Sequence, residues 1–176
     1  MTNSSTQDSS LTQLLRRETS AEVLFDDFSR GLYSTDASIY QIKPLGVVVP
    51  KTEQDVLATL GIANDAGVSV TMRGGGTSQC GQTVGEGIIV DVSKHLNRLI
   101  SVDPETRRAV VQPGIVLDQL NALLKPHGLF FPVDVSTSSR ATIGGMTANN
   151  SCGARSIRYG KMVDNVRAVD AVLADG

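Results

Sequence analysis

The stretch MRGGGTSQCGQTVGEG, residues 72–87, decides how the fold is assigned, because it holds six glycines in sixteen residues and follows the apolar run VSVTM, residues 68–72. Glycine loses more conformational entropy on folding than any other residue. A cluster of glycines is therefore useful mainly where the backbone takes a positive φ or approaches another group closely. The sequence predicts a loop, at the end of a strand, whose backbone comes close to a ligand. A flexible surface loop is the alternative.

Two known phosphate-binding glycine patterns do not fit this loop. In the dinucleotide pattern G-x-G-x-x-G, started at Gly74, the last glycine falls on Gln79. In the pattern G-x-x-x-x-G-K-[ST], started at Gly76, Gln82 replaces the lysine that reaches the phosphates. A cradle with another spacing remains, in which neighbouring donors converge on an anion. Its donors would be the backbone amides of Gly74, Gly75 and Gly76, the hydroxyls of Thr77 and Ser78, and the guanidinium of Arg73.

Strands and helices alternate around this loop. Short strands are predicted over residues 47–49, 68–73 and 87–92. A helix is predicted between the first two, with Thr52 as its N-cap, Asp55 at its third position and Gly67 as its C-cap. A strand, a helix and a strand joined by short connections indicate a parallel βαβ unit.

The N-terminal residues have a different pattern. Residues 1–10 are rich in Ser, Thr and Asn and are expected to be disordered. Leu11, Leu14 and Leu15 recur at helical spacing, and a second amphipathic helix is expected over residues 21–28.

The C-terminal half begins with a predicted hairpin over residues 99–114, turning at Asp103-Pro104, and continues with an amphipathic helix over residues 116–128. Residues 136–160 are expected to be a long loop, and the segment from 166 onward a strand. That strand ends on Asp175-Gly176, which is typical of a hairpin turn, with no returning strand after it. We therefore expect these residues to be a fragment of a longer domain.

A second glycine-rich stretch, residues 134–160, mixes small side chains, hydroxyls and amides. Such a segment packs poorly as core, but it suits a backbone laid along a large planar or extended ligand. Ser136, Ser138, Asn149 and Asn150 would hydrogen-bond to that ligand. A mobile, solvent-filled loop is the alternative.

Composition excludes several classes. The net charge of −2, the absence of tryptophan and the lack of a basic stripe argue against nucleic-acid binding. No stretch approaches the ~20 apolar residues that span a bilayer. The polar N-terminus lacks an apolar signal, so a cytoplasmic location is expected, with peripheral attachment to a membrane left open. Cys80 and Cys152 are interpreted as reduced thiols, and no metal site is predicted.

Four motifs in order resemble the FAD-binding domain of the vanillyl-alcohol oxidase/p-cresol methylhydroxylase (PCMH) superfamily. They are VVVPKTEQDV (47–56), RGGGTSQCGQ (73–82), IIVDVSKHLNRLISVDPETRRAVVQPGI (88–115) and ATIGGMTANNSCGARSIRYGKMVDNVRAVDAVLADG (141–176). The resemblance covers about residues 33–176. It looks closest to the FAD-linked D-2-hydroxy-acid dehydrogenases, which include D-lactate dehydrogenase, the FAD-linked chain of glycolate oxidase and D-2-hydroxyglutarate dehydrogenase. The segment YSTDASIYQIKPLGVVVP (33–50) also looks like that of large FAD/iron–sulfur members.

The resemblance implies an α+β, PCMH-type FAD-binding fold, in which a small parallel α/β subdomain precedes part of a larger, mainly antiparallel one. Residues 1–32 would be a disordered or helical lead and residues 33–94 the first FAD subdomain. Residues 95–176 would be the second subdomain, truncated, without the substrate-binding cap domain of the family.

The resemblance also implies a noncovalent FAD site. RGGGTS would wrap the pyrophosphate, QPG would form a turn beside the cofactor, and the later segments would run along the ribityl chain and the ring. The implied cofactor-binding residues are Arg73, Gly74, Gly75, Gly76, Thr77, Ser78, Gln82, Pro113, Gly114, Asp134, Ser136, Ser138, Thr142, Gly144, Gly145, Asn149, Asn150 and Ser151.

Two departures from the family pattern matter. Some members attach FAD through a histidine at the position of Thr77, which is why noncovalent binding is expected here. His95 and His127 lie elsewhere and are interpreted as structural or exposed. The family's further glycine-rich segment and its cap domain, which binds the hydroxy acid and accepts its proton, are not among these residues. No catalytic residue is therefore assigned.

The resemblance implies an oxidoreductase that transfers hydride from a D-2-hydroxy acid to flavin N5, with an iron–sulfur domain or another electron-transfer partner left open. This chain alone is expected to be inactive. A non-catalytic FAD- or nucleotide-binding fragment or subunit is one alternative. A same-fold flavoenzyme of different chemistry, such as an ether-lipid synthase or an aldonolactone oxidase, is another.

Overall fold

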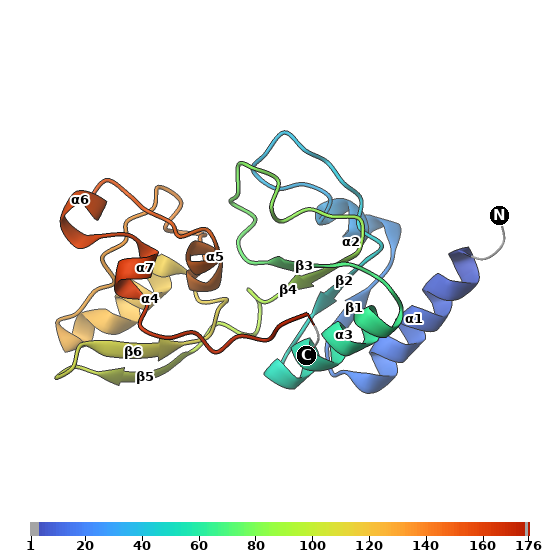
Figure 1. Ribbon diagram of the computed structural model, residues 1–176, viewed down its shortest axis with the longest axis horizontal. Coiled ribbons are helices and arrows are strands. Elements are labelled where there is room, and N and C mark those ends of the chain that lie inside the picture. The colour runs from blue at the N-terminus through green and yellow to red at the C-terminus, as the bar shows by residue number, and fades with distance from the viewer. Residues whose placement is uncertain (1–3, 175) are drawn as a thin grey trace.

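The computed structural model describes residues 4–174 and 176, whose helices and strands form two lobes side by side (Figure 1). A four-stranded sheet lies in the first lobe and a two-stranded hairpin in the second. The first lobe consists of α1 (Ser4–Glu18), β1 (Glu22–Leu24), α2 (Asp27–Leu32), β2 (Gly46–Val49), α3 (Glu53–Asp65), β3 (Val70–Arg73) and β4 (Ile88–Asp91). The second consists of β5 (Leu99–Asp103), β6 (Arg108–Val111), α4 (Leu117–Leu124), the 3-10 helix η1 (Lys125–His127), α5 (Ile143–Ala148), α6 (Ser156–Tyr159) and α7 (Met162–Asn165).

The first sheet confirms the predicted βαβ unit. Its strand order is β1-β2-β4-β3, and β4 pairs parallel with both β2 and β3. Helix α3 connects β2 to β3 and begins at the predicted capping box. There Thr52 Oγ1 accepts from the Asp55 amide at 3.1 Å, and Asp55 Oδ2 accepts from the Thr52 amide at 2.9 Å. The carboxyl ends of three parallel strands therefore meet at one edge of the sheet, and the glycine-rich segment leaves from that edge.

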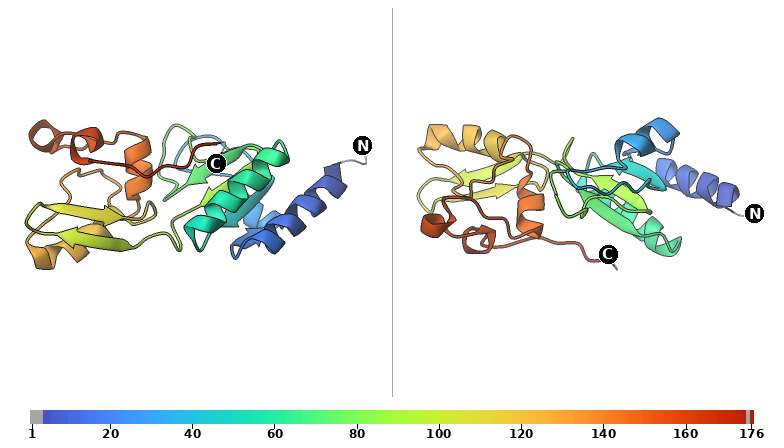
Figure 2. Two further views of the ribbon diagram at one scale, coloured as in Figure 1. Left: turned by 60° about the horizontal axis from the view of Figure 1, so that its bottom comes forward. Right: turned by 90° about the horizontal axis from the view of Figure 1, so that it is seen from above.

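Both faces of this sheet are covered, which explains why its central strands are continuously apolar. Val48 and Ile88 face the helices α1 and α3, which pack against each other (Figure 2). Val47 and Ile89 lie in a second cluster on which Tyr33 packs. All of these valines and isoleucines are fully buried.

The second lobe confirms the predicted hairpin and the helix that follows it. Strands β5 and β6 pair antiparallel, with Asp103 opposite Arg108. One face of the hairpin packs on a cluster that joins α4, α5 and α7, in which Leu117, Leu120 and Met162 are buried. The other face is open to solvent.

The helix expected over residues 21–28 is wrong in its first half. Residues Glu22–Leu24 form β1, which pairs antiparallel with β2, and the helix starts only at Asp27. The Asp26 side chain caps it by accepting from the Ser29 amide at 2.9 Å. A short apolar run fits either structure by its pattern, and here the unpaired edge of β2 decides for a strand.

Two expectations for the ends of the chain also need correction. The disorder expected over residues 1–10 is wrong for residues 4–10, which extend the helix that Leu11 and Leu15 anchor in the core. Residues 1–3 lie outside the described residues. The segment 166–174 forms no strand in the described part of the chain, and runs exposed from α7 back toward the first lobe (Figure 2). Apolar alternation supplies a propensity, but a strand also needs a hydrogen-bonding partner.

The long loop expected over residues 136–160 is interrupted by two short helices, α5 and α6. Thr142 caps α5 with its hydroxyl, which accepts from the Gly145 amide at 3.3 Å. Glycines usually break helices, but a Cβ on Gly144 would lie 2.6 Å from Pro113 Cβ and 2.9 Å from Pro113 O, so this position of α5 has no room for a side chain.

Candidate functional site

The loop that follows β3, residues 74–83, is called the glycine loop below. Strand β3 reaches its end at Arg73, which pairs with Asp91 of β4, and the glycine loop leaves from the carboxyl edge of the sheet. In open parallel sheets, ligands bind just outside this edge. The glycine loop is thus placed where the fold class puts its ligands.

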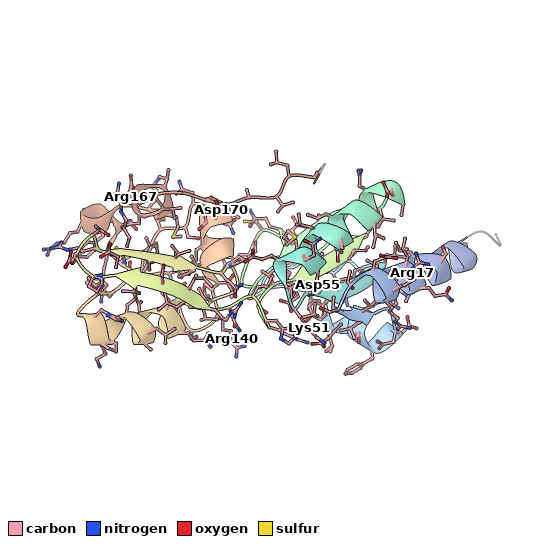
Figure 3. The ribbon with its side chains drawn as sticks, turned by 90° about the horizontal axis from the view of Figure 1, so that it is seen from below. Arg17, Lys51, Asp55, Arg140, Arg167 and Asp170 are labelled. Atoms are coloured by element: carbon pink, nitrogen blue, oxygen red, sulfur yellow. The ribbon has the colours of Figure 1, made fainter. Side chains whose placement is uncertain are left out.

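Backbone from the second lobe lies directly against the glycine loop. A Cβ on Gly75 would collide with the carbonyl oxygen of Arg140, and a Cβ on Gly74 would collide with Thr142 Oγ1. Figure 3 shows Arg140 at the junction of the two lobes, with Lys51 across it near the start of α3. The two glycine-rich stretches, far apart in sequence, therefore meet in one seam.

The amides of the glycine loop are available to a ligand. Within residues 4–174, the backbone N–H groups of Gly75, Gly76, Thr77 and Ser78 donate to no protein acceptor. Gly76 has a φ of +65° and uses only its carbonyl, which accepts from the Ala37 amide at 3.1 Å. Successive free amides in a turn with a positive φ form a concavity that suits an anion such as a phosphate. The residues present therefore fit a dinucleotide pyrophosphate.

Side-chain hydroxyls around the seam differ in their availability. Ser78 Oγ donates to Gln82 Oε1 at 2.6 Å and accepts from the Cys80 amide at 3.2 Å, so it shapes the loop itself. The hydroxyls of Thr77, Ser136 and Ser138 make no hydrogen bond to the rest of the described chain. These three hydroxyls are therefore available to a ligand.

The guanidinium of Arg73 is held by carbonyl oxygens. Its Nη2 donates to Thr35 O at 2.9 Å and its Nη1 donates to Thr83 O at 3.2 Å. Its carbon Cζ lies 5.2 Å from the centre of the Tyr33 ring, a cation–π distance. Arg73 belongs to the site, but it binds protein groups on three sides.

A set of polar residues that the sequence did not single out ties this region together. Tyr33 Oη donates to Asp91 Oδ2 at 2.7 Å, and Asp36 Oδ2 accepts from Thr83 Oγ1 at 3.0 Å. Burial and the neighbouring Asp91 carboxylate raise the pKa of the Tyr33 hydroxyl. Burial also acts to raise the pKa of Asp36, but hydrogen bonds from Ser38 and Thr83 outweigh it and leave that pKa lowered. The one sequence signal was Asp36 two residues before Ser38, a spacing typical of an Asx turn.

The QPG turn holds the second glycine-rich stretch in place. Pro113 O accepts from the Gly144 amide at 2.8 Å, and a Cβ on Gly144 would lie 2.6 Å from Pro113 Cβ. Gly114 is buried and donates its amide to Leu96 O at 2.7 Å. A Cβ there would collide with Val92 O, so packing alone requires a glycine at position 114.

Several of the remaining predicted residues bind neighbouring protein. Asp134 Oδ1 accepts from the Arg155 amide at 2.9 Å. Asn149 Nδ2 donates to Gly145 O at 3.1 Å, and Asn150 Oδ1 accepts from the Val163 amide at 3.0 Å.

Ser151 also contributes through its backbone, because its carbonyl oxygen accepts from the Met162 amide at 3.1 Å. The structure therefore brings Thr142 to the glycine loop and Gly144 to the QPG turn. Asp134, Asn150 and Ser151 instead bond to residues of α7 and of the turn before α6.

No three His, Cys, Asp or Glu side chains in the described residues are grouped so that they could hold a metal ion. Cys80 and Cys152 are both free and exposed. Among residues 4–174 and 176, no helix is both long and apolar enough to cross a membrane.

Comparison with known proteins gives the family. The sequence profile described as FAD binding domain matches residues 44–176. D-2-hydroxyglutarate dehydrogenase of Escherichia coli (strain K12) is 47% identical over 146 residues, which cover 81% of this chain and 14% of that protein. Glycolate oxidase subunit GlcD of Bacillus subtilis (strain 168) is 39% identical over 157 residues, which cover 86% of this chain and 33% of that protein.

Solved structures agree on the fold. Xylooligosaccharide oxidase from Myceliophthora thermophila C1 superposes with a TM-score of 0.79 at 23% identity, over 94% of this chain and 35% of that one. p-Cresol methylhydroxylase superposes with a TM-score of 0.68 at 20% identity, over 83% of this chain and 30% of that one. The chain spans about a seventh of the length of the D-2-hydroxyglutarate dehydrogenases that it matches. The chain belongs to the FAD binding domain family and has its PCMH-type fold, with FAD as the cofactor of the family.

Proposed function

We propose that this chain is the FAD-binding portion of a flavin-dependent dehydrogenase that oxidises a D-2-hydroxy acid. Four relatives named D-2-hydroxyglutarate dehydrogenase are 44–47% identical to it. Relatives named as a glycolate oxidase chain or as D-lactate dehydrogenase are 32–40% identical. This order favours a 2-hydroxyglutarate-type substrate over lactate or glycolate.

The observation on which the proposal rests is the row of free amides from Gly75 to Ser78, in a loop whose Gly75 lies directly against the Arg140 carbonyl. These amides would bind the pyrophosphate of FAD, with the Thr77 hydroxyl beside them. Bound FAD would supply the two-electron acceptor for the hydride of the substrate. Because position 77 is a threonine where some relatives have a linking histidine, the attachment we propose is noncovalent.

Around this loop, the protein's task is to orient the cofactor and to exclude water from it. We propose that residues 33–94 form the first FAD subdomain and residues 95–176 part of the second, with Ser136 and Ser138 available along the cofactor. A substrate-binding region and an electron-transfer partner, an iron–sulfur domain being one candidate, would be supplied elsewhere. The free, exposed thiols of Cys80 and Cys152 support a reducing, cytoplasmic location.

The first experiment is a titration of the purified chain with FAD, followed by quenching of flavin fluorescence. Gly75→Asp would place a side chain on the Arg140 carbonyl and a negative charge among the phosphate-binding amides. Gly31→Asp is the matched control, because nothing lies within 4 Å of a Cβ at Gly31. We expect the wild type and Gly31→Asp to bind FAD and Gly75→Asp not to bind, with far-ultraviolet circular dichroism showing that all three fold.

Binding by Gly75→Asp at wild-type affinity would contradict the assignment of the glycine loop to the pyrophosphate. The substrate class is tested separately on the parent enzyme, by its turnover of D-2-hydroxyglutarate, D-lactate and glycolate with an artificial electron acceptor in the presence of FAD. If the protein binds FAD and the parent enzyme turns over none of the three, the chain is a FAD-binding module of another system.

A further inference from the structure

Residues 33–40, called the N-terminal strap below, lie along the glycine loop in the first lobe (Figure 1). The strap is bound to the loop along its length. The Ala37 amide donates to Gly76 O at 3.1 Å, and Thr83 donates both its amide and its hydroxyl to Asp36 Oδ2. A Cβ on Gly81 would lie 2.6 Å from the Tyr40 ring, so the tip of the strap also packs closely on the loop.

Arg73 stands between the strap and the loop. One of its terminal nitrogens donates to Thr35 O in the strap, and the other donates to Thr83 O at the far end of the loop. The guanidinium also lies over the ring of Tyr33, whose hydroxyl is fixed to Asp91 at the end of β4. One side chain thus joins the strap, the exit of the loop and the end of the central strand.

The glycine loop passes closely over this guanidinium. A Cβ on Gly76 would lie 2.6 Å from Arg73 Nη2, and the loop takes its positive φ at this residue. The guanidinium is therefore one of the surfaces that sets the path of the loop.

We propose that Arg73 is a positioning residue: it holds the N-terminal strap against the glycine loop, and it orders the amides of residues 75–78 for the pyrophosphate without itself donating to the phosphates. The role of Arg73 in ordering these amides for the pyrophosphate rests on the FAD-binding function proposed above. The sequence pattern alone would assign the opposite role, that of a cation that neutralises the phosphates.

The two roles make different demands on the side chain. A positioning role needs a planar fork with two donors set apart and a flat face for the Tyr33 ring, and a lysine supplies neither. A phosphate-neutralising role needs a positive charge, which a lysine retains. Substitution by lysine therefore separates the two roles.

The experiment compares Arg73→Lys, Arg73→Met and Tyr33→Leu. Tyr33→Leu removes the ring under the guanidinium and leaves the charge of Arg73 intact. Arg17→Lys and Arg17→Met are the controls, because Arg17 is an exposed arginine of α1 that pairs with Glu18. For each variant, amide hydrogen exchange of Ala37 and Thr83 is measured without FAD, and the Kd for FAD is measured by fluorescence quenching.

We expect all three variants at Arg73 and Tyr33 to accelerate exchange at Ala37 and Thr83, because both amides bond across the strap–loop contact. We expect Arg73→Lys to weaken FAD binding as much as Arg73→Met does, by about tenfold or more, the scale of a lost charge-assisted hydrogen bond. Tyr33→Leu should weaken FAD binding in the same direction, and the Arg17 controls should change neither quantity.

The proposal is overturned if Arg73→Lys binds FAD within about twofold of wild type while Arg73→Met loses affinity, since charge alone would then suffice. Unchanged exchange at Ala37 and Thr83 in the variants would also overturn it. If the wild type binds no FAD, the function proposed above fails. Exchange in the FAD-free protein still decides whether Arg73 holds the strap.

Discussion

A substitution at Gly114, in the QPG turn, can show whether this glycine is needed for packing or for cofactor binding. The substitution Gly114→Ala adds one methyl group in a buried turn. That methyl would collide with Val92 O and lie 2.7 Å from Leu96 O, and both are backbone atoms that cannot rotate away. The backbone at Gly114 does not have a positive φ, so alanine adds no backbone strain. The cost therefore comes from these contacts.

Overpacking of this kind costs about 1–3 kcal/mol. Moving the turn would also lengthen the hydrogen bond from the Gly114 amide to Leu96 O, now 2.7 Å, and the loss of such a bond costs about 1 kcal/mol more. We expect Gly114→Ala to lower the free energy of unfolding by about 2–4 kcal/mol, the sum of the two contributions. For a chain of this size, that corresponds to a drop in Tm of roughly 5–15 °C.

The matched control is Gly61→Ala in the middle of α3, where nothing lies within 4 Å of the added methyl. The same chemical change should there stabilise the protein by about 0.5–1 kcal/mol, because alanine restricts the unfolded chain and favours a helix. Both variants are unfolded in urea and followed by far-ultraviolet circular dichroism. Stability of Gly114→Ala within about 0.5 kcal/mol of wild type would refute the packing argument. Loss of FAD affinity at unchanged stability would assign Gly114 to the cofactor instead.

Three other predictions test the local interactions around the site. Thr142→Ala should cost about 1–2 kcal/mol in urea unfolding, because it removes the cap of α5, while Thr142→Ser should restore most of the loss. The buried Asp55 has a lowered pKa, since hydrogen bonds from the Ser20, Lys51 and Thr52 amides outweigh the effect of burial. Its contribution to stability is present above the ordinary pKa of 3.8 and is lost as the pH falls through the lower folded value. The stability of wild type should therefore rise as the pH increases toward 3.8 and level off above that value, and Asp55→Asn should flatten that rise in urea unfolding. His95→Ala should raise the pKa of Glu22 toward 4.5, since the hydrogen bond from His95 is the main cause that lowers it. A carbon-13 NMR titration measures this pKa, and an unchanged value would contradict the contact.

Local patterns were sufficient where the interacting residues lie close together in sequence. The capping box of Thr52 and Asp55 spans four residues, and the hairpin turn after Asp103 closes on Arg108. Each was correctly predicted, because side-chain chemistry and strand alternation act over the same few residues. The run from Glu22 to Leu24 was misassigned, since the strand that pairs with it lies more than twenty residues further along the chain.

The glycine spacing and the missing lysine at Gln82 are visible in the sequence, and they indicated an anion cradle that follows neither of the two known patterns. The noncovalent FAD site was what the family resemblance implied, through the threonine at position 77. The tertiary structure decided that Gly75 presses on the Arg140 carbonyl and that Gly114 has no room for a methyl group.

The tertiary structure also decided that the guanidinium of Arg73 binds two carbonyl oxygens. The physical reason is that the spacing of glycines shows where the chain must allow a close approach, but it does not show which other segment makes that approach. An arginine in the sequence likewise shows that a positive charge is present. The groups that it binds depend on segments that only folding brings together.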